Sequence, residues 1–307
     1  MFDYDFMRTA FVAGAVVAVA AGAVGYFLVL RNLTFAGHAL GHVGFAGATG
    51  SVLVGLSPLW GLLAFTVAAA VAMGLLGERL RQRDVAVGIV LSLALGFGVL
   101  FLYLYTSSAS EAAAILFGNI LGVSAATLWS LVGLTVATLA ALAAISRPLL
   151  FASLAPDIAE AKGVPLRLVS VLFLAIVAVA VAEAAQIVGI LLVFALMVGP
   201  AAAAQRRSVR LAPGVTLAIV LAVAETWGGL VLAYVTDWPT TFWIVTLSCL
   251  VYFVSLLRPA RRRVQAEIPS IRRAARAAVA GGSRPRSRSG CGSDAPDRAR
   301  ACAAARG

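Results

Sequence analysis

The sequence predicts an all-α polytopic membrane protein. Hydrophobic residues make up 62% of the 307 residues and the mean hydropathy is +0.99, whereas ordinary soluble domains are roughly 45–50% apolar. Repeated apolar runs of about 20 residues are each long enough to cross a hydrocarbon core of ~30 Å. The only two histidines of the chain lie four residues apart inside one of these runs, and they are the first place to look for function.

We interpret nine apolar segments as membrane helices, with eight or nine as the plausible count. The segments cover residues 10–30, 34–56, 58–77, 85–105, 127–146, 169–186, 188–205, 213–235 and 239–257. A cleaved signal peptide is not expected, because the first apolar run is too long for a signal sequence and lacks a small-residue cleavage site. Residues 111–123 are too short and too polar to span, which favours a surface or re-entrant helix on the outer side.

The basic residues predict the orientation of the chain. If every segment crosses, Arg8 lies on one side and the other ten basic residues before position 258 lie on the opposite side. Because cytoplasmic loops carry the excess of Lys and Arg, we expect the N-terminus outside and the C-terminus inside. The link 147–168 is then cytoplasmic, and a plasma-membrane location follows.

The chain divides into a transmembrane domain, residues 1–257, and an Arg-rich cytoplasmic tail, residues 258–307. The tail holds thirteen arginines against three acids, a net charge of +10 out of the +11 of the whole chain. Its composition cannot form a core and predicts disorder, although residues 268–280 could form a basic helix on anionic lipid. Nucleic-acid binding is not expected, since basic segments beside a membrane helix follow from topology alone.

The two histidines, His38 and His42, are the candidate metal ligands. Positions i and i+4 share one helix face about one turn apart, so both imidazoles can bind one divalent ion. Two imidazoles are an incomplete shell for zinc, which suits a site that must bind and release. Glu225, or the same pair from a second copy, could complete the shell. Imidazole suits Zn²⁺ better than Mg²⁺ or Ca²⁺, which prefer oxygen ligands.

Two glutamates also lie inside apolar segments, where burying a charge is costly. Glu225 lies near the middle of its segment and is a candidate for the transport path. Glu183 lies toward the outer end of its segment, and either an interhelical hydrogen bond or a functional role would explain it. Glycines recur along residues 34–55, which places this segment at the centre of the bundle because other helices can approach it closely.

The link 147–168 contains a short helix, opened by Pro156 and Asp157 and closed by Gly163. It is either a docking element for a soluble partner or an ordered interfacial loop.

The chain has a single lysine and no phosphate-binding loop, so another subunit must supply any energy. A polytopic zinc enzyme is the alternative of a different class, but His-x-x-x-His without an intervening glutamate lacks a general base. Cys249, Cys291 and Cys302 have no metal-site or disulfide spacing.

These residues resemble a known family, the zinc/manganese ABC-importer permeases. Residues 31–42, Arg-Asn-Leu-Thr-Phe-Ala-Gly-His-Ala-Leu-Gly-His, followed by Gly47, resemble its signature. In the family, an arginine ending the first helix is followed by Gly-Asp-Ala-x-Ser-His and then by a glycine. The resemblance continues through residues 84–89, 116–121, 156–164, 188–202 and 234–239, in order along 8–257.

The resemblance implies a homodimeric permease, a pair of cytoplasmic ATPase subunits and an extracytoplasmic protein that delivers the metal. It makes 147–168 the coupling segment, with five residues expected at the ATPase contact: Pro156, Asp157, Glu160, Ala161 and Gly163. His42 matches the histidine of the family, whereas His38 stands where the commoner form has aspartate. Replacing a carboxylate by imidazole shifts the preference from Mn²⁺ toward Zn²⁺, so we hypothesise a Zn²⁺ importer without a permanently bound cofactor. Import of Mn²⁺, iron or a metal chelate on the same fold is the alternative.

Overall fold

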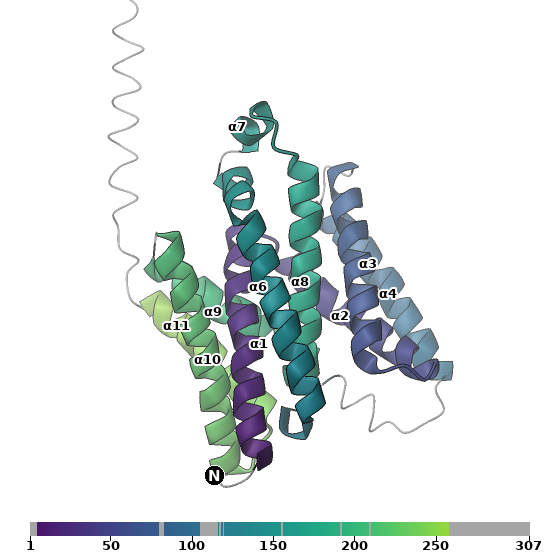
Figure 1. Cartoon of the computed structure of the whole chain (residues 1–307), viewed down its shortest axis with the longest axis vertical. Coiled ribbons are helices and arrows are strands. Elements are labelled where there is room, and N and C mark those ends of the chain that lie inside the picture. The colour runs from purple at the N-terminus through teal and green to yellow at the C-terminus, as the bar shows by residue number, and fades with distance from the viewer. Residues whose placement is uncertain are drawn as a thin grey trace, which may run out of the picture. The chain divides into compact units, whose positions relative to one another are not determined.

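The computed structural model describes residues 5–79, 83–104, 116, 118, 120–154, 156–190, 192–208 and 210–257. These residues are almost entirely helical (Figure 1). The elements are α1 (Asp5–Leu30), α2 (Thr34–Leu53), α3 (Pro58–Arg79), α4 (Arg83–Leu104), the 3₁₀ turn η1 (Ile120–Gly122), α6 (Ala125–Leu154), α7 (Pro156–Ala161), α8 (Leu166–Val188), α9 (Val193–Arg207), α10 (Leu211–Thr236) and α11 (Thr240–Leu257). The tail 258–307 and most of the segment expected to form a surface or re-entrant helix lie outside the described residues.

The all-α class is confirmed, whereas the count of nine membrane-spanning helices is not. Each of the nine predicted segments coincides with a helix, but only seven described helices are long and apolar enough to cross a membrane, namely α1, α3, α4, α6, α8, α10 and α11. Helix α9 has 15 residues, which is about 22 Å of helix and too short for a ~30 Å core. In α2 the two histidines and five glycines lower the hydropathy. The orientation of the termini stays a prediction.

Helices α1 and α8 form the centre of the bundle. In each of them 72% of the apolar window is buried, against 22% in α4 and α6 and 17% in α11. Helix α2 packs against α3, α4, α8 and α9, and 12 of its 20 residues are buried. The glycine-rich segment therefore lies within the bundle and contacts four helices, although the central helices are α1 and α8.

Helices α2 and α3 cross at two glycines. A Cβ atom at Gly47 would overlap the carbonyl oxygen of Gly61, and a Cβ atom at Gly61 would overlap that of Gly47. Only two glycines allow the backbones to approach this closely. Leu62, the neighbour of Gly61, fills the space beside Gly44 one turn earlier on α2. This crossing fixes the depth at which α2, and the histidines on it, lie in the bundle.

The corner between α1 and α2 sets where α2 begins. Asn32 has a φ of 54°, its N–H donates to the carbonyl of Val29, and the N–H of Leu33 donates to the carbonyl of Leu28. This pair of bonds is the Schellman ending of a helix, with asparagine in the left-handed position. Arg31 donates from Nη2 to Ser170 Oγ at 3.0 Å, so the same corner is attached to α8.

The predicted link 147–168 is mostly helical. Helix α6 continues through Pro148 to Leu154, and α7 follows directly, at the end of the bundle opposite the N-terminus (Figure 1). Gly163 closes α7 with a φ of 78°, and the N–H groups of Gly163 and Val164 donate to the carbonyls of Glu160 and Ala159. Only glycine accepts this conformation without strain. The short helix closed by glycine is thus confirmed.

Candidate functional site

The two histidines meet on the half-buried face of α2. His38 Nε2 and His42 Nε2 are 3.3 Å apart, and the two ring planes are nearly perpendicular, with centroids 4.7 Å apart. Both side chains are half-buried. Without an ion, one nitrogen can donate a hydrogen bond to the other. The helical spacing therefore does bring two imidazole nitrogens to one point.

The separation of these nitrogens fits a shared metal ion. Two ligands at 2.0–2.1 Å on a tetrahedral zinc ion are about 3.3–3.4 Å apart. The pair therefore needs little rearrangement to bind such an ion, although it supplies only two of the four usual ligands. Among the described residues there is no group of three or more His, Cys, Asp or Glu side chains that could hold a metal. The described residues therefore supply no third His, Cys, Asp or Glu ligand beside the pair.

The surroundings of the pair were not predicted. The ring of Phe194, in the first turn of α9, packs edge-on against His38 with centroids 5.2 Å apart. The helical run is interrupted between α8 and α9, and the carbonyl oxygen of Ile190 in this break lies 3.4 Å from where a Cβ of Gly41 would be. Broken helices at membrane depth are tolerated where they are buried in protein or line a water-filled cavity. In the sequence, the Val-Gly-Ile motif at 188–190 marks the position of this break.

Glu225 lies on a different part of the bundle. It is 2% exposed on α10, and α10 packs against α1, α9 and α11. Neither carboxylate oxygen has a hydrogen-bond partner among the described residues, and the nearby Ser248 hydroxyl donates instead to the carbonyl of Ala195. Within one copy, Glu225 is therefore not grouped with the two histidines, and its role as a metal ligand stays a prediction.

Glu183 is held by two threonines. It is fully buried on α8, and the hydroxyls of Thr135 and Thr138 on α6 donate to its Oε2 and Oε1, each at 3.0 Å. Both oxygens thus have a donor one helix away, which is how a polar group is accommodated inside a membrane bundle. The geometry matches the interhelical hydrogen bond, one of the two explanations left open by the sequence.

Comparison with known proteins decides the family. A model of the ABC 3 transport family matches residues 3–259. The chain belongs to this family. The match covers the whole of α1 to α11, and it confirms the resemblance to ABC-importer permeases that residues 31–42 carry. Together with the seven apolar helices, it identifies the chain as the multi-pass membrane component of such a transporter.

Individual relatives are distant but cover most of the chain. It is 27% identical to the manganese transport system membrane protein MntC of Listeria innocua over 84% of this chain and 92% of that protein. It is 28% identical to the manganese import system permease protein ScaB of Streptococcus gordonii, over 85% and 94%. The solved structure of PsaBC from Streptococcus pneumoniae in complex with Fab is similar with a TM-score of 0.76 and 26% identity, over 86% and 96%. MntC and ScaB are both named as membrane components of manganese transport.

Proposed function

We propose that this chain is the permease subunit of an ABC importer of divalent metal ions in the plasma membrane, and that Zn²⁺ is its cargo. The observation that supports the proposal is the convergence of His38 Nε2 and His42 Nε2 on one face of α2, 3.3 Å apart. Family membership supplies the class of transporter, and the imidazole pair supplies ligands that borderline metals prefer. The ion is the transported substrate rather than a resident cofactor.

Manganese is the second candidate, because several relatives are named as manganese transport proteins. The difference in chemistry lies at position 38. A carboxylate there would supply the oxygen ligand that Mn²⁺ favours, whereas His38 supplies nitrogen. Because no acidic side chain among the described residues of one copy is grouped with the two histidines, we favour Zn²⁺.

Uptake by living cells distinguishes the two metals. The full transporter would be expressed in cells that lack their own zinc and manganese importers, and the uptake of labelled Zn²⁺ and Mn²⁺ would be measured separately. We expect uptake of Zn²⁺, inhibited by excess unlabelled Zn²⁺ and only weakly by Mn²⁺. Uptake that follows Mn²⁺, iron or a chelate and ignores Zn²⁺ would replace the zinc assignment while leaving the permease assignment intact.

A second copy of the chain would complete the site. The face of α2 that carries the histidines is half-exposed in one copy, and Phe35 on this face is 43% exposed. A homodimer that joins these faces would cover Phe35 and bring four imidazoles together, the number of ligands usual for zinc. The mass of the purified membrane part, measured by light scattering, tests the homodimer. An extracytoplasmic metal-binding protein would deliver the ion on the outer side.

The segment 147–168 is proposed as the docking site of a separate ATPase subunit. Leu154 and Ile158 are 74% and 56% exposed at this end of the bundle, and Glu160 is exposed beside them. Apolar side chains exposed next to a short capped helix are typical of a surface that a partner covers. The Lys162 ammonium, directly after α7, lies 5.6 Å from the ring centre of Phe151 on α6. Through this contact, a displacement of α7 by a bound subunit would be transmitted to α6.

Disrupting α7 should therefore uncouple the transporter. We expect Gly163→Pro, which cannot adopt the φ of 78°, and Glu160→Arg to abolish metal uptake and the binding of the ATPase subunit. Membrane insertion, measured by the amount of protein in washed membranes, should be unchanged. Asp5→Asn is the control, since it removes one exposed charge in the first turn of α1, which starts at the end of the bundle opposite α7 (Figure 1). Normal uptake by both α7 variants would contradict the docking assignment.

A further inference from the structure

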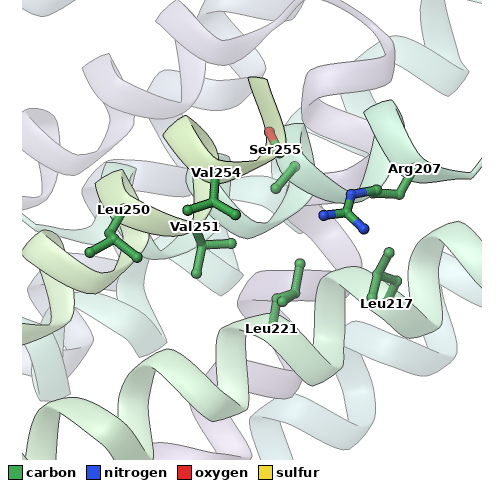
Figure 2. Close-up of a pocket in the computed structure, with 8 residues that line it drawn as sticks. Arg207, Leu217, Leu221, Leu250, Val251, Val254 and Ser255 are labelled. Carbon is green, nitrogen blue, oxygen red and sulfur yellow. The ribbon is translucent and has the colours of Figure 1, made fainter. Parts of the chain in front are cut away.

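A groove with one cation at its end runs along α10 and α11. Figure 2 shows its inner cavity, of about 250 Å³, with Leu217 and Leu221 of α10 on one wall and Leu250, Val251 and Val254 of α11 on the other. The Arg207 side chain, in the last turn of α9, points into this cavity from its end (Figure 2). The groove is otherwise lined almost wholly by apolar side chains.

The groove continues into a second cavity farther from Arg207. This outer cavity, of about 520 Å³, shares Leu221 and Val251 with the inner one, so the two lie next to each other along α10 and α11. Trp227 and Phe11 line it, and the indole N–H of Trp227 donates to the carbonyl of Phe11 at 3.1 Å. Glu225 also lines it but is only 2% exposed, so little of its charge is presented to the groove.

The groove lies on a face of the bundle that is suited to contact lipid. Only 17% of the apolar window of α11 and 33% of that of α10 is buried. Leu250, on the rim of the groove, is 54% exposed. An apolar groove at membrane depth fits the hydrocarbon chain of a lipid.

The cation at the end of the groove favours a lipid with an anionic head group. Within the described residues, Arg206, Arg207 and Arg210 form no ion pair with an acidic side chain. A guanidinium is the side chain best suited to bind a phosphate through two parallel hydrogen bonds. The Arg-rich sequence that follows α11 carries the same sign of charge as Arg207, so charge complementarity favours an anionic ligand over this segment.

We propose that this groove binds an anionic phospholipid, with the phosphate at Arg207 and one acyl chain between α10 and α11. In the predicted orientation the lipid belongs to the cytoplasmic leaflet, where anionic lipids attract basic residues. The lipid would hold the outermost helix, α11, against α10. This inference is independent of the identity of the transported metal.

Native mass spectrometry of the purified full-length chain tests the proposal. After removal of bound lipid with excess detergent, equal amounts of phosphatidylglycerol and phosphatidylethanolamine with the same acyl chains would be added back. We expect about fivefold more bound phosphatidylglycerol than phosphatidylethanolamine, and Arg207→Gln should remove this preference. Arg206→Gln, one residue away and not lining the groove, should keep it.

A second variant tests the groove itself. Val251→Trp places a large ring where the two cavities join and should lower the binding of both lipids; if this variant does not stay folded, Leu250→Trp on the exposed rim replaces it. An unchanged preference for phosphatidylglycerol in Arg207→Gln, or an equal loss of it in Arg206→Gln, would overturn the proposal. Either result would show that the preference comes from the overall positive charge of this surface and not from Arg207. Unchanged lipid binding in the tryptophan variant would overturn the groove as the binding place.

Discussion

Alanine at either His38 or His42 is expected to lower the initial rate of metal uptake at least about 100-fold. Each substitution leaves one imidazole where the structure has two nitrogens 3.3 Å apart, and a single imidazole is too weak a site to capture an ion from a delivery protein. The measurement is uptake of labelled Zn²⁺ in cells without their own zinc importers, normalised to the amount of permease in the membrane. Folding should be unaffected because both side chains are half-buried.

Two further variants make this result specific. Val136→Leu changes an exposed side chain on α6, outside the histidine face of α2, and should leave uptake near that of the parent. His38→Asp introduces the carboxylate of the commoner family form, and it should restore uptake with a preference shifted from Zn²⁺ toward Mn²⁺. If uptake survives both alanine substitutions, the pair is structural and the search for the translocation site moves to Glu225.

The sequence predicts the helices well because hydropathy and helix signals are local. The nine apolar segments coincide with nine helices, and Gly163 ends α7 as its conformational freedom predicts. The exception is α6, predicted to end before Pro148. It continues to Leu154 because Leu149 and Ala152 are buried after the proline, so packing outweighs the hydrogen bond that the proline lacks.

The sequence does not predict which helices lie next to one another in the bundle. Helical rise gives the depth of a residue in the membrane, and on depth alone Glu225 was a reasonable third ligand for the histidines. Which helices are adjacent depends on long-range packing, and α10 packs against α1, α9 and α11 whereas α2 packs against α3, α4, α8 and α9. The contact between Phe194 and His38 is unpredictable for the same reason. The histidine pair itself was predictable because its geometry lies within one helical turn.

The crossing of α2 and α3 should be one of the most sensitive packing contacts in the bundle. Gly47→Ala adds a single methyl group, but that group would overlap the carbonyl oxygen of Gly61, and a backbone cannot turn away as a side chain can. We expect a loss of stability of about 1–3 kcal/mol or more. The measurement is the temperature at which half of the purified protein leaves the monodisperse peak in size-exclusion chromatography after heating.

Gly133→Ala on α6 is the matched control, since apart from its own helix turn no atom of the described residues lies within 4 Å of its added methyl group. This variant should be neutral or more stable by up to about 1 kcal/mol, because alanine favours a helix over glycine. Equal thermal stability of the two variants would contradict a tight crossing. Because Gly47 lies on the same helix as His42, any surviving Gly47→Ala protein should also import metal more slowly, whereas Gly133→Ala should not. A lower uptake per amount of folded permease in the membrane would tie the position of the histidine pair to the backbone contact of two glycines.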